Sequence, residues 1–217
     1  MKRREFLKIA GIAGATLALR EGGGWLFNNK KKSKYSKNIV AINGSPNVDG
    51  DTAFALSLMT EEFQKSGINF KILNVGNLDL HGCIACSRCR ETKKCIFENN
   101  IETEIITKMK QADAIILASP VFFGGIAGTM KSFLDRAFYS QSSEFAHKLG
   151  AAVVTTPRIG ASMAFESLNQ YFTIAQMPVV SSRYWNNIRG ENSELQNDEE
   201  GIKTIRLLAQ NMAEMLN

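Results

Sequence analysis

From Asn38 onward, short runs rich in β-branched residues alternate with longer segments whose apolar residues recur at helical spacing. This alternation is typical of an α/β domain built on a parallel sheet. We expect strands at 39–43, 69–75, 114–119, 151–155 and 179–181, and helices at 52–65, 101–110, 129–139, 162–176 and 199–216. Five strands that alternate with five helices predict a doubly wound sheet, in which ligands bind outside the carboxyl ends of the strands.

Charge is distributed unevenly along the 217 residues. The whole chain has a formal net charge of +5, but its first 37 residues hold ten Lys or Arg and two Glu. Residues 38–217 therefore hold 16 basic and 19 acidic side chains and are mildly acidic. The sequence thus disfavours a basic nucleic-acid-binding face, and nucleic acid is not an expected partner.

The basic segment 1–37 has the layout of an export signal followed by a basic linker, and we separate it from the domain predicted at 38–217. Its head, RREFLK from Arg3 to Lys8, resembles the core of twin-arginine signals and precedes eleven small or apolar residues at 9–19. That run is shorter than the roughly 20 residues of a membrane span. We therefore expect a periplasmic or other extracytoplasmic location and transient membrane contact through the leader. Cleavage near Ala18 and retention as a membrane anchor both remain open.

The loop that follows the first predicted strand is a candidate phosphate site. It is rich in small and hydroxyl residues and leads directly into a helix, whose first N–H groups favour an anion. It is neither a P-loop nor a GxGxxG turn, and a simple turn with a helix cap is the alternative interpretation. Its candidate ligand-binding residues are Ser45, Pro46, Asn47, Asp51 and Thr52.

A second candidate loop follows the third predicted strand. Pro120 is expected to end that strand, an aromatic pair follows, and the glycines permit close approach of a planar ligand. The candidate residues are Pro120, Val121, Phe122, Phe123, Gly124 and Gly125. A phosphate-seeking loop and an aromatic, glycine-rich loop at one switch point together suggest flavin mononucleotide (FMN). Arg158 and Gly160, after the fourth strand, are weaker candidates to border the same ligand.

All four cysteines of the chain lie within thirteen residues, at Cys83, Cys86, Cys89 and Cys95. Such compact spacing lets one loop wrap one cubane, so we predict that they ligate a [4Fe-4S] cluster. Tetrahedral zinc, unligated thiols and, in an oxidising compartment, disulfides are the alternatives. Because this loop follows the second strand, we expect its metal to share the carboxyl edge of the sheet with the flavin, in the same or a neighbouring subunit.

The motifs GSPNVDGDT, GCIACSRCRETKKC and SPVFFGGIAGTMKSFLDR resemble those of the flavodoxin-like NADPH-dependent FMN reductases, and within them the iron-sulfur flavoproteins. The resemblance covers nearly all of residues 38–217. It implies a five-stranded parallel sheet in the order 2-1-3-4-5, bound FMN, reduction by NAD(P)H or a protein donor, and a homodimer or homotetramer.

Carried over residue by residue, the resemblance places Ser45, Asn47, Asp51 and Thr52 at the FMN phosphate, and Pro120–Gly125 along the isoalloxazine. This chain departs from the family where Asn47 replaces a frequent Arg and Asp51 replaces a frequent Asn. Both departures should weaken phosphate binding without abolishing it. Asp135 and Arg136 are interpreted as a structural ion pair rather than an acid–base couple.

The predicted function is FMN-dependent transfer of electrons from NAD(P)H or a protein donor to an acceptor that the sequence does not identify, with the cluster as a one-electron partner. One alternative is a plain NAD(P)H-dependent FMN or quinone reductase whose cysteines are structural. The other is a non-enzymatic electron-transfer flavoprotein. No catalytic side chain is predicted.

Export should depend on the arginine pair. Replacing Arg3 and Arg4 together by Lys keeps the positive charge but removes the guanidinium groups of the motif. We expect the variant to accumulate in the cytoplasm, as measured by cell fractionation. Unchanged export of this variant, or a parent protein that is never exported, would contradict the prediction.

Overall fold

The computed structural model describes residues 37–190 and 192–217, so the predicted leader lies almost entirely outside the described part of the chain. The strands are β1 Lys37–Asn43, β2 Ile68–Asn74, β3 Ala114–Phe122, β4 Gly125–Ile126, β5 Leu149–Thr156 and β6 Asn187–Arg189. The helices are α1 Asp51–Lys65, α2 Cys89–Thr92, α3 Asn100–Gln111, α4 Gly128–Phe145, α5 Ala161–Ile174 and α6 Glu199–Leu216, with a 3-10 helix at Asn192–Asn197. None of these helices has both the length and the apolar character of a membrane span.

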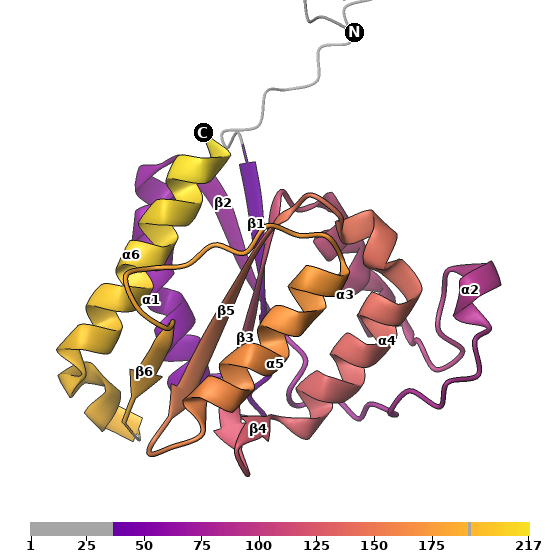
Figure 1. The fold of residues 1–217 in the computed structure, drawn as a ribbon, viewed down its shortest axis with the longest axis horizontal. Coiled ribbons are helices and arrows are strands. Elements are labelled where there is room, and N and C mark those ends of the chain that lie inside the picture. The colour runs from indigo at the N-terminus through magenta and orange to yellow at the C-terminus, as the bar shows by residue number, and fades with distance from the viewer. Residues whose placement is uncertain (1–36, 191) are drawn as a thin grey trace, which may run out of the picture. The chain divides into compact units, whose positions relative to one another are not determined.

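The sheet has the order β2-β1-β3-β5-β6, and these five strands run parallel. Counted without β4, this is the predicted order 2-1-3-4-5, so the flavodoxin-like fold is confirmed (Figure 1). The two-residue β4 was not expected, and it pairs antiparallel with the end of β3.

Alternation along the strands divides the core between the two faces of the sheet. Ile39 and Ala41 of β1 pack with the apolar sides of α1 and α6, whereas Val40 and Ile42 pack with those of α3, α4 and α5. Because both faces are covered, the middle strands are apolar throughout, as is usual for parallel sheets. Polar chemistry is therefore confined to the ends of the strands.

The fifth strand was predicted at 179–181, and this is wrong. Val179 forms only an isolated bridge with Gly150, and the fifth parallel strand is Asn187–Arg189. Between them the Asn186 side chain donates to Ala152 O at 3.1 Å and accepts from the Ser182 hydroxyl at 2.7 Å. Such side-chain bonds compete with ladder pairing and delay the strand.

Pro120 does not end the third strand, because β3 continues to Phe122. Gly44 N donates to Ala118 O, so the backbone N–H and C=O groups of Ala118 face β1. Because this direction alternates along a strand, the backbone nitrogen and C=O of Pro120 face the same side. The pairing of β1 with β3 stops at Ala118. Proline is tolerated there because the missing N–H faces no neighbouring strand.

Candidate functional site

The loops that follow β1, β3 and β5 meet at the carboxyl edge of the sheet. The Thr52 and Thr155 hydroxyl oxygens lie 2.9 Å apart, which links the start of α1 to the end of β5. A Cβ added to Gly160 would lie 3.1 Å from Gly124 Cα, so the loop after β5 packs against the β3–β4 turn. The structure therefore brings both predicted flavin loops to one edge.

The loop after β1 is held by its own polar groups. Ser45 N donates to Asn43 Oδ1 at 3.0 Å, and Asn47 N donates to Ser45 Oγ at 3.2 Å. The helix that follows begins with Gly50 as its N-cap, and glycine has no side chain that could cap it. An uncapped helix start offers N–H groups to an anion, which fits the phosphate of FMN. Pro46 is exposed beside this loop.

Gly76 supports the same loop from beneath and was missed in the sequence. It is buried just after β2, and a Cβ at this position would lie 2.2 Å from both the carbonyl carbon and the oxygen of Ser45. Backbone atoms cannot move aside as a flexible side chain can. Only glycine permits this close approach of two backbone segments. The one sequence feature that could have indicated it is the position of Gly76 directly after a predicted strand.

The second predicted loop is a two-residue hairpin. Phe122 pairs with Gly125, and the two residues between them have positive φ, 50° at Phe123 and 81° at Gly124. Positive φ at both positions is the mark of a type I′ turn. The turn leaves the rings of Phe122 and Phe123 exposed at the site edge, while Val121 is half-buried behind them.

A cleft of about 530 Å³ opens next to these loops, between the loop after β5, the start of α5, β6 and the start of α6. Arg158 and Gly160 line it from the loop after β5. Tyr184 and Trp185, whose ring centroids lie 4.9 Å apart, line it from the segment before β6. Its volume is in the range of small-molecule sites, and it lies at the edge where the flavin loops meet.

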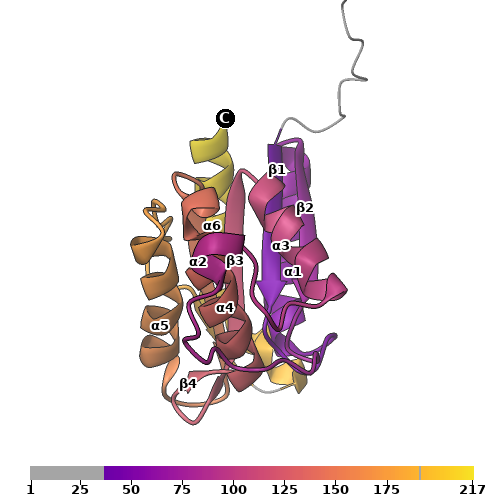
Figure 2. The ribbon, with the colours of Figure 1, turned by 90° about the vertical axis from the view of Figure 1, so that its right-hand side faces the viewer.

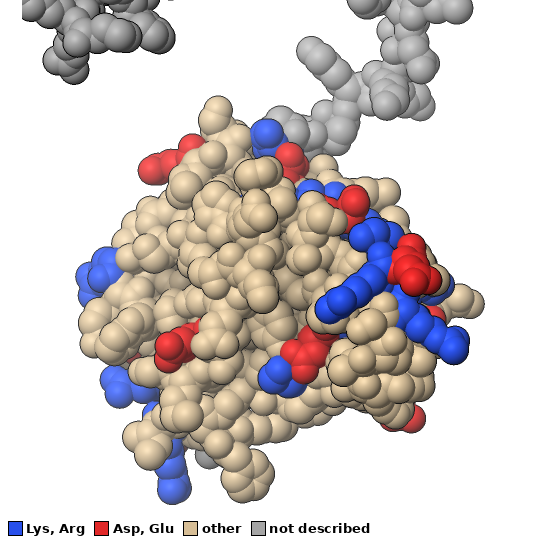
Figure 3. All heavy atoms as spheres, turned by 45° about the vertical axis from the view of Figure 1, so that its right-hand side comes forward, with Lys and Arg blue, Asp and Glu red and all other residues tan. Residues whose placement is uncertain are grey.

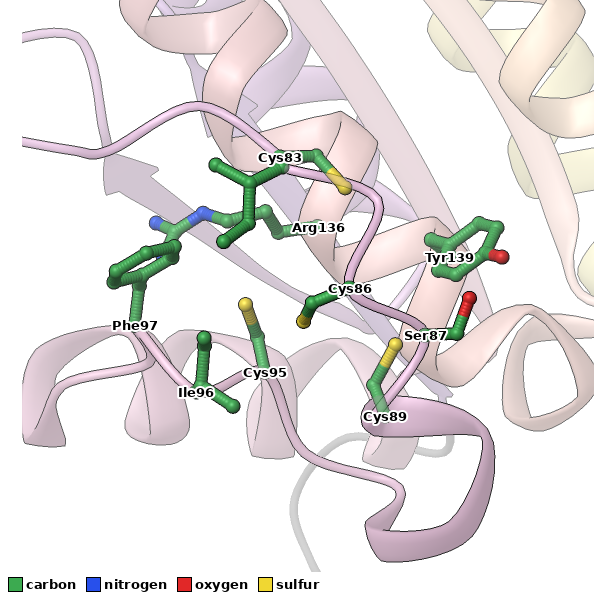
Figure 4. Close-up of a pocket in the computed structure, with 10 residues that line it drawn as sticks. Cys83, Cys86, Ser87, Cys89, Cys95, Ile96, Phe97, Arg136 and Tyr139 are labelled. Atoms are coloured by element: carbon green, nitrogen blue, oxygen red, sulfur yellow. The ribbon is translucent and has the colours of Figure 1, made fainter.

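The four cysteines line one small pocket together with Arg136 and Tyr139 of α4 (Figure 4). Cys83 and Cys86 are exposed, Cys95 is half-buried, and Cys89 is buried. Burial, and then the nearby Cys95, raise the pKa of the Cys89 thiol. The cysteines are not joined by disulfides, and among residues 37–190 and 192–217 no three His, Cys, Asp or Glu side chains converge as ligands of one metal ion.

The loop that carries the cysteines follows an unusual backbone path. Ala85, Ser87 and Lys93 have positive φ values of 54°, 61° and 55° and alternate with the cysteines along the chain. Each non-glycine residue in this conformation costs free energy and persists where the surroundings hold it. Here the surroundings include α4, because Arg90 Nη2 donates to the Tyr139 hydroxyl at 3.0 Å and the Gln141 amide donates to Lys93 O.

Within one chain the cysteine pocket lies along α4 and not beside the flavin loops; the alternative that its metal adjoins the flavin of a neighbouring subunit stays a prediction. Arg136 is the ninth residue of α4, so the pocket stands about 12 Å along that helix from its start at the carboxyl edge. Both ribbon views show α2 as the outermost element beside α4 (Figures 1 and 2). The cysteine loop leaves the sheet at the carboxyl edge, after β2, and is long enough to run along α4.

The sequence suggested an ion pair between Asp135 and Arg136, and this is wrong. Asp135 binds Lys131 one turn earlier at 2.6 Å, whereas Arg136 forms an ion pair with Glu102 of α3. Adjacent residues of a helix point in different directions, so the side chains of Asp135 and Arg136 do not face each other. Burial raises the pKa of the Glu102 carboxyl group. The hydrogen bond from Asn99 N–H and the positive charge of Arg136 act in the opposite direction and lower it.

Charge around the loop is mixed. Its own basic residues are exposed, and Figure 3 shows Lys and Arg interspersed with Asp and Glu on the side of the molecule that carries it. These basic residues are Arg88, Arg90, Lys93 and Lys94.

Solved structures share this fold. One is a WrbA-like flavodoxin protein from Agrobacterium tumefaciens, 17% identical with a TM-score of 0.60, where the match covers 83% of this chain and 97% of the other. Another is an NADH:FMN oxidoreductase, 19% identical with a TM-score of 0.59, with 84% and 91% covered. At this level of identity the similarity establishes the fold alone.

The family model for NADPH-dependent FMN reductases matches residues 37–190, and the chain belongs to this family of FMN-dependent oxidoreductases. It is also similar to an iron-sulfur flavoprotein of Methanocaldococcus jannaschii, with 29% identity over 187 residues that cover 82% of this chain and 96% of the relative. A second iron-sulfur flavoprotein, from Methanosarcina thermophila, is 26% identical over 183 residues, with 82% and 94% covered.

Gly76→Ala should displace the Ser45 peptide, because the new methyl group overlaps backbone atoms. Overpacking of this kind costs about 1–3 kcal/mol, so we expect a lower thermal unfolding midpoint and roughly tenfold or weaker FMN binding, measured by fluorescence titration. Gly128→Ala is the matched control, since an added Cβ there meets nothing within 4 Å. A Gly76→Ala protein that binds FMN as tightly as the parent would refute the role of this contact.

Proposed function

We propose that this FMN-dependent oxidoreductase moves electrons from NAD(P)H or a protein donor to a separate acceptor through a [4Fe-4S] cluster held by Cys83, Cys86, Cys89 and Cys95. The observation that carries the proposal is the shared pocket. Four cysteines of one short loop line it in a chain whose family binds flavin. The names of the iron-sulfur relatives support the same assignment.

The residue types present suit both cofactors: four free thiols of one loop line one pocket, although no three of them converge on one point in the described conformation. The uncapped start of α1, with Ser45 and Asn47 before it, would hold the FMN phosphate, and the Phe122–Gly125 hairpin would lie along the flavin ring. When bound, a flavin accepts two electrons as hydride and releases them singly, which suits a one-electron centre. The protein's part is to bind the flavin at the edge, exclude water beneath the exposed rings and hold the cysteine loop on α4.

The exposure of Cys83 and Cys86 favours a protein as one electron-transfer partner. A centre open to solvent on the outer side of α4 can be approached closely by a second macromolecule. A plain NAD(P)H-dependent reductase with structural cysteines remains the second candidate, supported by the family match alone.

We also propose that the chain forms a homodimer or homotetramer and acts outside the cytoplasm after twin-arginine export. Assembly is supported by exposed apolar side chains at the carboxyl edge, where Phe122 and Phe123 stand near Ile159 and Met163. A second copy packed there would bury these side chains and enclose the flavin edge. Export rests on the sequence of residues 1–37, where the leader would also make the transient membrane contact.

Cys89→Ser should lose iron and acid-labile sulfide together while the protein keeps most of its FMN, because the flavin loops belong to other segments. The measurement is iron, sulfide and flavin analysis of anaerobically purified protein. Ser87→Ala is the control, since Ser87 lines the same pocket without a thiol. Full iron in Cys89→Ser, or zinc or two disulfides in the parent, would favour the plain reductase.

The flavin released from the parent protein should be FMN rather than FAD, because the sequence offers one phosphate loop and no second dinucleotide turn. Ser45→Ala should weaken FMN binding by about 10- to 100-fold, which corresponds to about 1.5–3 kcal/mol for a bond to a charged group. Ser57→Ala, an exposed serine of α1 that bonds only to Phe54 O, should leave affinity unchanged. Recovery of FAD, or equal affinity in the Ser45 variant, would contradict this assignment.

A further inference from the structure

Arg136 is a buried guanidinium with one unsatisfied nitrogen. Only 3% of the residue is exposed. Its Nε donates to Ser132 O at 3.4 Å, and its Nη2 pairs with Glu102. Nη1 is buried and has no hydrogen-bond partner among the described residues. Buried donors are nearly always satisfied, so this nitrogen needs an acceptor that the polypeptide does not supply.

The guanidinium is held in a fixed orientation. Glu102 accepts from Asn99 N at 3.1 Å through its second oxygen, and Glu102 N donates to Asn99 Oδ1 at 2.9 Å. This capping box fixes Glu102 on the first turn of α3, and Glu102 in turn fixes Arg136 across from α4. Two helices therefore position Nη1 before any ligand arrives.

The surroundings of Arg136 indicate what the acceptor is. Arg136 lines the cysteine pocket, and its guanidinium lies beside the Phe97 ring at one side of the group of cysteines (Figure 4). Apart from Ser87 and Tyr139, the other residues of that lining are Ile84, Ile96, Phe97 and the four cysteines. Glu98 Oε2, also buried without a partner, is the competing acceptor outside this lining.

We infer that Arg136 donates from Nη1 to a sulfur of the cluster and thereby raises the reduction potential of the cluster. The inference rests on the proposed function, since it requires the cluster at the four cysteines. Reduction adds negative charge to the cluster, and a fixed cation with an N–H donor stabilises that charge most in a dry environment. Glu102 is then the positioning residue that aims the guanidinium.

The test is a charge-neutral double variant, Glu102→Gln with Arg136→Met, in the full chain purified anaerobically. It removes the donor without leaving Glu102 as an unpaired buried charge. We expect a lower midpoint potential in an EPR-monitored redox titration, with iron and sulfide content retained. The matched control, Glu104→Gln with Lys108→Met, removes an ion pair from the surface of α3, the helix that carries Glu102, and should leave the potential within experimental error of the parent.

The outcomes separate the two hypotheses. A parent protein without iron and sulfide refutes the proposed function. A double variant with a full cluster and an unchanged potential refutes the role of Arg136. If the double variant does not fold, Arg136→Lys provides the test, because it keeps the charge but loses the fixed fork. Its potential should also fall, and a potential equal to that of the parent overturns the inference.

Discussion

Burial of the middle strands on both faces is the constraint from which the rest of the structure follows. Neither β1 nor β3 carries a polar side chain in its buried middle, and Asn43 and Ser119 are the buried polar residues that these strands offer towards the carboxyl edge. Asn43 accepts a hydrogen bond from the loop after β1 and so orders that loop. The Ser119 hydroxyl accepts a hydrogen bond from Ala127 N at 3.0 Å, which holds the segment that leads into α4. The flavin edge is thus organised by the residues at which the core ends.

The two candidate cofactor sites are built in different ways. The flavin loops depend on backbone features, namely an uncapped helix, a close glycine contact and a turn with two positive φ values. The cysteine loop depends on side chains that attach it to α4, with Tyr139 and Gln141 as its anchors. A loop of this kind needs no place in the sheet, so a loop that carries four cysteines can be added to a flavodoxin-like fold without altering its strands.

Much of the fold could be predicted from the sequence, because burial on both faces imposes long apolar runs that alternate with helical patterns. The strand order and the helices that cover the sheet are confirmed. The fifth strand was misplaced because Val179 and Val180 have high β-propensity, while Asn186 bonds to Ala152, which is far away in the sequence. Pro120 was misread because its effect depends on which neighbour faces it, and that follows only from the register with β1.

The candidate site was predictable in its residue types and less so in its arrangement. Both flavin loops meet as expected, and the cysteines do share one pocket. Gly76 and the Glu102–Arg136 pair escaped notice because each acts on a partner more than 30 residues away. No local pattern marks such a contact. The predicted roles of the individual flavin-binding residues and ligands remain predictions.

The topology also has a consequence for how the domain can be tethered. Parallel strands all begin at one edge and end at the other, so Lys37 at the start of β1 and the end of α6 both lie opposite the flavin loops (Figure 1). The seven residues of β1 separate the two edges by about 20 Å. A chain attached before Lys37 therefore joins the domain at the edge opposite the flavin loops.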